Sequence, residues 1–240
     1  MTTAHIAGST IGLVSVNVGG VGYLGERRGA IVESGILKHA VSEPFVRVTL
    51  TNLAGDEQAD LRVHGGPDKA VYAYPSEHVA WWTAELNPKN PLGPGSFGEN
   101  LTVTGWTEDI VQIGDVWQWG TAMLQVCQPR YPCFKLSMAT GQPRIGKLMV
   151  TSGRTGWYLR VLEEGEGPTD GPIFLSDRSS RLISVLDAHR ARLPGAAPKL
   201  IQRVVGEESL SAGLRADLQH EINIAVRPRV NVVGDEAVLE

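Results

Sequence analysis

The sequence predicts a mainly β protein with added helices, in which a β-barrel or sandwich is followed by a small domain of three helices. Glycine and proline supply 28 and 14 of the 240 residues, so tight turns are frequent. The short segments between these turns are apolar and rich in β-branched residues, as strands are. After a linker at 165–172, leucine, isoleucine and valine recur at helical spacing instead.

Four strands are expected in the first third of the chain, at 11–18, 30–34, 45–50 and 70–74. The glycine-rich segment 19–29 is expected to be a loop. It carries Arg27 and Arg28, so it is either an anion-binding loop or a solvated one. The first ten residues have neither the basic nor the apolar part of a signal peptide, and we expect a mobile start.

One helix is expected over 76–86, with Ser76 as its N-cap and an apolar face made by Val79, Trp82 and Leu86. A proline- and glycine-rich surface loop at 87–96 follows it.

Three strand-like segments come next, at 99–105, 109–120 and 121–128. Trp117 and Trp119 share one face of their strand, and we expect both to pack in the core. A short helix over 145–153, ended by Gly153, and a closing strand over 156–165 complete the barrel.

The C-terminal part divides into helical segments at 179–193, 196–206 and 207–221, punctuated by serines 179 and 209, Pro194 and Gly206. We therefore expect a β domain, a barrel or sandwich, over 11–176, a three-helix domain over 177–222, and a tail or edge strand over 223–240. Three short helices cannot form a large core alone, so they should dock on the barrel or on a partner subunit.

Composition excludes several classes of function. The chain has 22 basic and 26 acidic residues, a net charge of −4, and so lacks the overall positive field of nucleic-acid or anionic-membrane binders. It has no apolar run long enough to span a membrane. Two cysteines are too few for a secreted disulfide framework, so we expect a soluble protein of the reducing cytoplasm.

The segment QVCQPRYPCFKL at 125–136 carries the clearest chemistry. Two prolines stiffen the chain before Cys133. Arg130 and Lys135 flank this cysteine, and nearby cations favour its thiolate form, which is a nucleophile and a soft metal ligand. A helix beginning at Cys133 would act in the same direction. Cys127 lies in an apolar strand and has the pattern of an inert buried residue. A disulfide between the two is sterically allowed, although a reducing compartment disfavours it.

Two further segments carry polar groups in turns. His64, Gly65, Gly66 and Lys69 lie between strands, where bare backbone N–H groups and a cation could hold a phosphate, and an ordinary turn is the alternative. Glu99 and Asn100 follow Gly98 and could offer a hydrogen-bond acceptor and an amide to a heterocycle. An ordinary turn is again the alternative. Neither cysteine has further ligands at zinc spacing, and there is no P-loop motif.

A family resemblance rests on five strings of the sequence. They are GILK at 35–38, AGDEQADLRVHGGPDKAVYAYPSEHVAWW at 54–82, FGENL at 97–101, IGDVWQWGTAMLQVCQPRYPCFKL at 113–136 and GRTGWYLRVL at 153–162. Together they resemble the MOSC domain, the family named for the C-terminal domain of molybdenum-cofactor sulfurase. The likeness covers about 11–176 and is to the bacterial branch that includes the N-hydroxylaminopurine reductase. That branch has a MOSC β-barrel followed by three helices.

The resemblance implies a barrel that binds the molybdenum cofactor, molybdopterin. Cys133 matches the family cysteine that is a molybdenum ligand or a persulfide carrier. An anionic pterin phosphate needs cations, and the candidates are Lys38, Lys69, Arg130 and Arg154. The residues that match motif positions and are expected to contact pterin or substrate are His64, Gly65, Gly66, Glu99 and Asn100, with Glu99 and His64 as candidate proton donors.

The function implied first is a molybdenum-dependent oxidoreductase, acting in detoxification, that reduces N-hydroxylated bases or related N-oxygenated compounds. The chain has neither a dinucleotide-binding fingerprint nor an iron–sulfur motif, so its electrons would come from a separate flavin or iron–sulfur protein. Two alternatives stay open: a sulfur carrier that uses a persulfide on Cys133, and a non-enzymatic carrier of the cofactor. A homodimer is an open alternative to a monomer.

Overall fold

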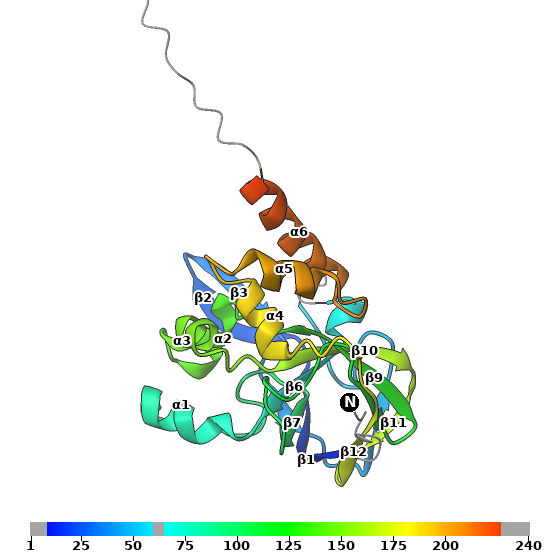
Figure 1. The fold of residues 1–240 in the computed structure, drawn as a ribbon. Coiled ribbons are helices and arrows are strands. Elements are labelled where there is room, and N and C mark those ends of the chain that lie inside the picture. Colours follow the sequence, from blue (N-terminus) through cyan, green and yellow to red (C-terminus); the bar gives the residue numbers. More distant parts are fainter. Residues whose placement is uncertain (1–8, 60–64, 227–240) are drawn as a thin grey trace, which may run out of the picture.

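Seven strands form a closed barrel in the computed structural model, which describes residues 9–59 and 65–226 (Figure 1). Around the barrel the strand order is β12, β8, β9, β10, β6, β7, β1, and β1 pairs back to β12. All these pairings are antiparallel except that of β6 with β7. The bounds are β1 Thr10–Val18, β6 Val71–Pro75, β7 Leu101–Thr104, β8 Val116–Trp119, β9 Ala122–Pro129, β10 Trp157–Glu163 and β12 Pro172–Asp177. The expected barrel is confirmed.

The barrel interior is filled by the apolar residues that alternate along these strands. Trp117 and Trp119 are both fully buried, as expected from their shared face. The Trp117 ring meets Trp157 edge-on, with centroids 5.8 Å apart. The segment expected as a strand over 109–120 is extended only from Val116, because the chain before it turns back in hydrogen-bonded turns.

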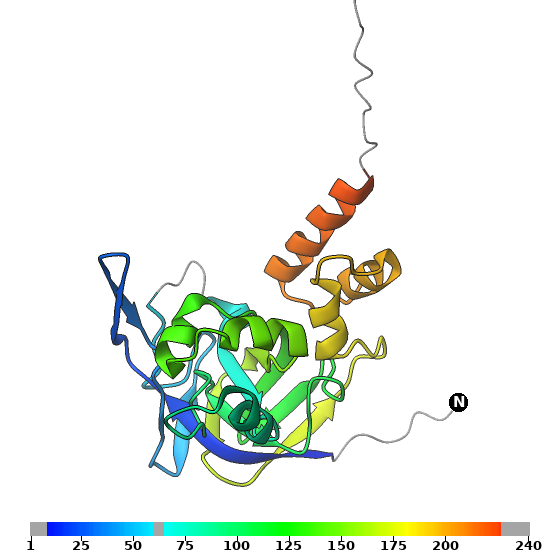
Figure 2. The same ribbon diagram turned by 90° about the vertical axis from the view of Figure 1, so that its left-hand side faces the viewer.

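Further short strands lie outside the seven-stranded barrel. β2 (Gly22–Arg27) and β3 (Ala30–Ser34) form a hairpin that projects from the body in Figure 2. The expectation of a loop over 19–29 is therefore wrong for most of that segment. Arg28 and Gly29 have φ values of 54° and 76°, as a two-residue hairpin turn requires. β4 (His39–Ala40) pairs with β1, and β5 (Phe45–Val48) pairs with β11 (Gly165–Pro168), within the expected linker.

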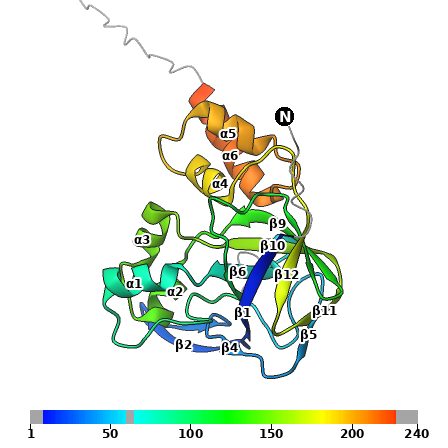
Figure 3. The ribbon, with the colours of Figure 1, turned by 60° about the horizontal axis from the view of Figure 1, so that its bottom comes forward.

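Three helices cover one side of the barrel (Figure 3): α1 (His78–Leu86), α2 (Phe134–Thr140) and α3 (Ile145–Ser152). They enclose a second apolar cluster around Tyr74, Trp82 and Phe97. Ser76 is not the N-cap of α1, because Glu77 takes that position and the helix begins at His78. Gly153 ends α3 with φ 74°, as expected.

The C-terminal helices lie together at one end of the barrel (Figure 1): α4 (Val185–Ala191), α5 (Pro198–Val205) and α6 (Ala212–Val226). They share one apolar core with the barrel strands, so they dock on the β domain. α4 is shorter than the helix expected over 179–193, because its N-cap is Ser184 and not Ser179. α6 begins after Ser211, and not near Ser209 as expected.

The ends of the chain differ from the expectation. Residues 223–226 belong to α6 and not to a tail, and the rest of the expected tail, 227–240, lies outside the described residues. Thr10 is already in β1, so the expected mobile start does not extend to it. In the described part of the chain, no helix is long and apolar enough to cross a membrane.

Asp68, in the turn Pro67–Lys69 before β6, connects the barrel to the helical domain. Its carboxylate accepts hydrogen bonds from Arg160 in β10, at 2.9 Å, and from the backbone N–H of Ala212 at the start of α6, at 3.1 Å. Beside it, the Ser211 hydroxyl donates to the side chain of Gln128 at 2.6 Å, inside the interface. These contacts hold the start of α6 against the turn before β6 and the end of β9.

Candidate cofactor site around Cys133

Cys133 lies where a stiff loop meets a helix. β9 ends at Pro129, the backbone N–H of Arg130 donates to Gly156 at 3.3 Å, and the chain then runs extended to Cys133 at φ −114° and ψ 171°. α2 begins at the next residue, which confirms the conditional expectation of a helix there. Cys133 is partly exposed, Cys127 is buried, and no disulfide joins them.

Arg130 and Lys135 bring positive charge to this loop. The Arg130 side chain is buried, with its guanidinium 4.8 Å from the centre of the Tyr72 ring. Burial lowers the pKa of a guanidinium, but Tyr72, Tyr158 and Cys133 act in the other direction and the pKa of Arg130 is raised. Lys135 is held from the side of the β2–β3 hairpin, because its ammonium donates to the carbonyl of Glu33 at 2.8 Å.

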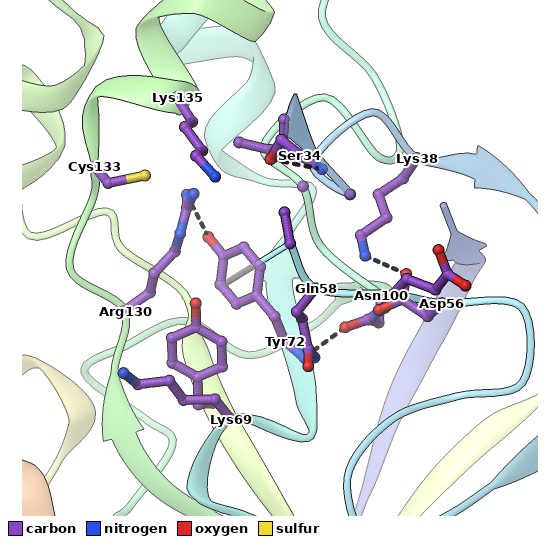
Figure 4. A pocket seen from close by; sticks show the side chains of 16 residues that line it. Ser34, Lys38, Asp56, Gln58, Lys69, Tyr72, Asn100, Arg130, Cys133 and Lys135 are labelled. Atoms are coloured by element: carbon purple, nitrogen blue, oxygen red, sulfur yellow. Dashed lines mark hydrogen bonds and ion pairs between the residues drawn. The ribbon is translucent and has the colours of Figure 1, made fainter. Parts of the chain in front are cut away.

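A pocket with an empty volume of about 590 Å³ opens beside these residues. Figure 4 shows Cys133, Arg130 and Lys135 at one end of it and Lys38 with Asp56 at the other. Its described lining residues include four cations, Lys38, Lys69, Arg130 and Lys135, and two carboxylates, Asp56 and Glu57. We call this the cation pocket. Its net positive lining fits an anionic ligand.

Lys38 reaches the pocket through a close approach of two loops. Gly35 lies so near the carbonyl of Glu57 that a Cβ atom there would be 2.0 Å from it, so only glycine fits. This approach places the Lys38 ammonium against the buried carboxylate of Asp56. Burial lowers the pKa of Lys38, and the carboxylate opposes that shift.

The side chains of Asn100 and Glu99 form hydrogen bonds within the protein. The Asn100 amide donates to Asp56 at 3.0 Å and to the carbonyl of Asn17 at 3.2 Å, and it accepts from the backbone of Tyr72 at 3.0 Å. Asn100 therefore lines the pocket as a support of Asp56.

Glu99 is fully buried, and burial raises its pKa. Its carboxylate accepts from the backbones of Gly95 and Phe97, at 2.7 Å and 3.0 Å, and from the Thr102 hydroxyl at 2.8 Å. These bonds hold the loop before β7, and Glu99 is not among the described residues that line the cation pocket.

The other predicted site residues are divided between two places. Gly65, Gly66 and Lys69 line a second pocket, and only Lys69 of these also lines the cation pocket. Gly66 has φ 95° with open space beside it, so it is needed for conformation and not for close approach. Arg154 stacks on Trp81 at 4.3 Å and is outside the described lining. His64 lies outside the described residues.

Comparisons with known proteins agree with this fold. The sequence model of the MOSC domain family matches residues 60–177 of this chain. The uncharacterized protein YflK of Bacillus subtilis is 42% identical over 205 residues, which is 85% of this chain and 91% of YflK. This chain belongs to the MOSC family.

Two further relatives place it within the family. The crystal structure of YiiM from Geobacillus stearothermophilus superposes with a TM-score of 0.71 at 31% identity, covering 88% of this chain and 99% of YiiM. A protein of Gibberella moniliformis named "Reductase" is 35% identical over 79% of this chain, but the match spans only 31% of that longer protein. The expected branch, with its three C-terminal helices, is thereby confirmed.

MOSC domains are generally associated with the molybdenum cofactor, and the residues of the cation pocket fit that group. In the described parts of the chain, no three His, Cys, Asp or Glu side chains gather as a metal site. Molybdenum held by pterin sulfurs needs few protein ligands, and a single thiolate such as Cys133 suits it. The cations suit the pterin phosphate.

Sequence reasoning missed Asp56, Tyr72 and Tyr158. Asp56 lies within a quoted family string, but its role depends on Asn100, 44 residues away. Tyr72 and Tyr158 read as strand residues, and nothing local marks them as neighbours of Arg130. Long-range pairing of β6 with β10 brings them together, with Tyr158 opposite Tyr72 in register.

Proposed function

We propose that this MOSC protein is a molybdenum-cofactor-dependent reductase of N-hydroxylated bases or related N-oxygenated compounds, with Cys133 as the protein ligand of the metal. One observation carries the proposal: the cation pocket joins the partly exposed Cys133 to a lining in which cations outnumber carboxylates. The fungal relative named "Reductase" supports the type of reaction.

The chain's own residues would bind and orient the group. Arg130 and Lys135, at the Cys133 end of the pocket, would neutralise its negative charge, and Arg130 is held in place by the Tyr72 ring and hydroxyl. Lys38, at the other end, is paired with Asp56. Bound molybdenum supplies the redox chemistry, taking electrons from a donor and passing them to the substrate. Reduction of an N-hydroxyl compound to the amine consumes two electrons and two protons and releases water, and we propose a separate flavin or iron–sulfur protein as donor.

Pocket tyrosines supply protonated hydroxyls. Burial raises the pKa of Tyr158, and the Tyr72 hydroxyl donates to the carbonyl of Thr155 at 2.9 Å. Tyr158 therefore stays neutral near Cys133 and is the described pocket residue best suited to orient an N-hydroxyl group.

The test is reduction of N-hydroxylaminopurine by chemically reduced protein purified from a molybdenum-replete host. We expect amine formation by the wild type. Lys135→Ala should weaken cofactor retention by roughly tenfold or more, because a charge-assisted hydrogen bond contributes roughly 1.5–3 kcal/mol. Lys147→Ala, an exposed lysine on α3, is the matched control and should behave as the wild type. Absence of both molybdenum and turnover would reject the proposal.

The same material distinguishes the alternatives. The partial exposure of Cys133 also suits a persulfide carrier. A cyanolysable sulfur on Cys133 without molybdenum would favour that carrier. Tight cofactor binding without turnover would favour a delivery protein.

A further inference from the structure

A second pocket, of about 1140 Å³, also reaches Cys133. Its walls come from the glycine turn before β6, the loop 128–133, and the helical domain, which contributes Arg192, Ser211, Leu214 and Asp217. It shares Lys69, Cys133 and Tyr158 with the cation pocket. Cys133 thus borders two pockets, and we call the second one the helical-domain pocket.

The two pockets differ in charge. In the helical-domain pocket, the described cations Lys69 and Arg192 are balanced by Asp68 and Asp217. Three of these groups are in ion pairs: Asp68 with Arg160 at 2.8 Å, and Arg192 with Asp217 at 3.1 Å. A balanced, paired lining suits an uncharged ligand, whereas the cation pocket suits an anion. Cofactor and substrate of the proposed reaction differ in the same way.

Planar groups are stacked in the helical-domain pocket. The Arg192 guanidinium lies 4.3 Å from the centre of the Tyr131 ring, and Asp217 on α6 pairs with it from the other helix. Tyr131 is 48% exposed although it is a large aromatic residue in a stiff loop two residues from Cys133. An exposed ring with an ordered guanidinium gives a planar heterocycle a stacking surface and hydrogen-bond donors.

We propose that the helical-domain pocket binds the substrate, a planar uncharged N-hydroxylated base, with Tyr131 and Arg192 as specificity-determining residues and Asp217 as the positioning residue for Arg192. The N-hydroxyl end points toward Cys133, where the two pockets meet. The helical domain then completes the substrate site. This inference rests on the proposed function for the identity of the ligand.

Binding can be measured without turnover. N-hydroxylaminopurine is titrated into the protein by calorimetry. In parallel, its protection of Cys133 against iodoacetamide is followed on protein from a host grown without molybdenum, in which no metal covers the thiolate. Cys127 does not interfere, because it is buried and burial raises the pKa of its thiol to about 12. Tyr131→Ala and Arg192→Ala should each weaken binding by roughly tenfold, the effect of one lost stacking contact. Tyr131→Phe keeps the ring and should retain affinity.

Controls separate this inference from the proposed function. Arg190→Ala, an exposed arginine of α4, should bind as the wild type does, and circular dichroism verifies the fold of each variant. In reduction assays, Arg192→Ala should raise KM and leave molybdenum content unchanged. Absence of binding to the wild type, or unchanged affinity in both alanine variants, would overturn the inference even if the protein is a reductase. Tyr131-dependent binding without turnover would instead uphold the pocket and reject the reductase.

Discussion

The two cysteines lie six positions apart and have opposite environments. Cys127 is a buried residue of β9, with its sulfur 3.2 Å from the carbonyl oxygen of Asp68. Its thiol is neutral at physiological pH because burial raises the pKa to about 12. Cys133 has left the strand and lies beside Arg130 at the mouth of two pockets. The contrast expected from loop context alone thus has a structural basis.

Asn100 allows a prediction at the scale of one residue. Asn100→Ala removes three buried hydrogen bonds and leaves the Tyr72 N–H and one oxygen of Asp56 without this partner. We expect the free energy of unfolding to fall by roughly 2–4 kcal/mol, measured by urea denaturation. Asn90→Ala, at an exposed position, is the control. Equal stability of the two variants would show that the network does not support the pocket.

At the scale of elements, α4 is attached to α3 through His189. The imidazole is buried, and its Nε2 lies 2.8 Å from the carbonyl of Val150 in α3. Burial lowers the pKa of His189 below its ordinary value of 6.5, so the neutral ring is the stable form in the folded protein.

This pKa predicts how stability depends on pH. Below pH 6.5 the unfolded chain binds a proton at His189 that the folded chain does not, so the free energy of unfolding should fall as pH falls through this window. In His189→Gln that part of the slope should disappear. His39→Gln, at an exposed position, should keep it. Identical slopes in the wild type and His189→Gln, measured by urea denaturation at several pH values, would contradict the assignment.

Elements were predictable where the signal is local. The apolar, β-branched composition of 11–18 and the glycine after 145–152 identified β1 and α3. The β2–β3 hairpin was missed because its turn, Arg28–Gly29, lacks a strong hairpin dipeptide such as Asn-Gly. Ser184 was missed as a cap because another serine, at 179, precedes the same apolar run; the Ser179 hydroxyl bonds to Glu207 instead, at 2.8 Å.

For the whole molecule, the sequence and its family resemblance predicted the barrel and the three helices, but not that Cys133 borders two pockets. This arrangement depends on how the helical domain docks, and docking depends on contacts such as Asp68 with Ala212, 144 residues apart. The local charge of the cation pocket also explains how a chain of net charge −4 could hold an anionic cofactor. Four cations against two carboxylates give the cation pocket a positive lining although the whole chain is negative.

The central claim is that the cation pocket holds the molybdenum cofactor through Cys133. Its most direct test is the molybdenum content of protein purified from a molybdenum-replete host, as wild type, Cys133→Ala and Cys127→Ala. We predict near-stoichiometric molybdenum in the wild type and in Cys127→Ala, and loss of the metal in Cys133→Ala. A wild type without molybdenum, or equal retention in both variants, would contradict the claim.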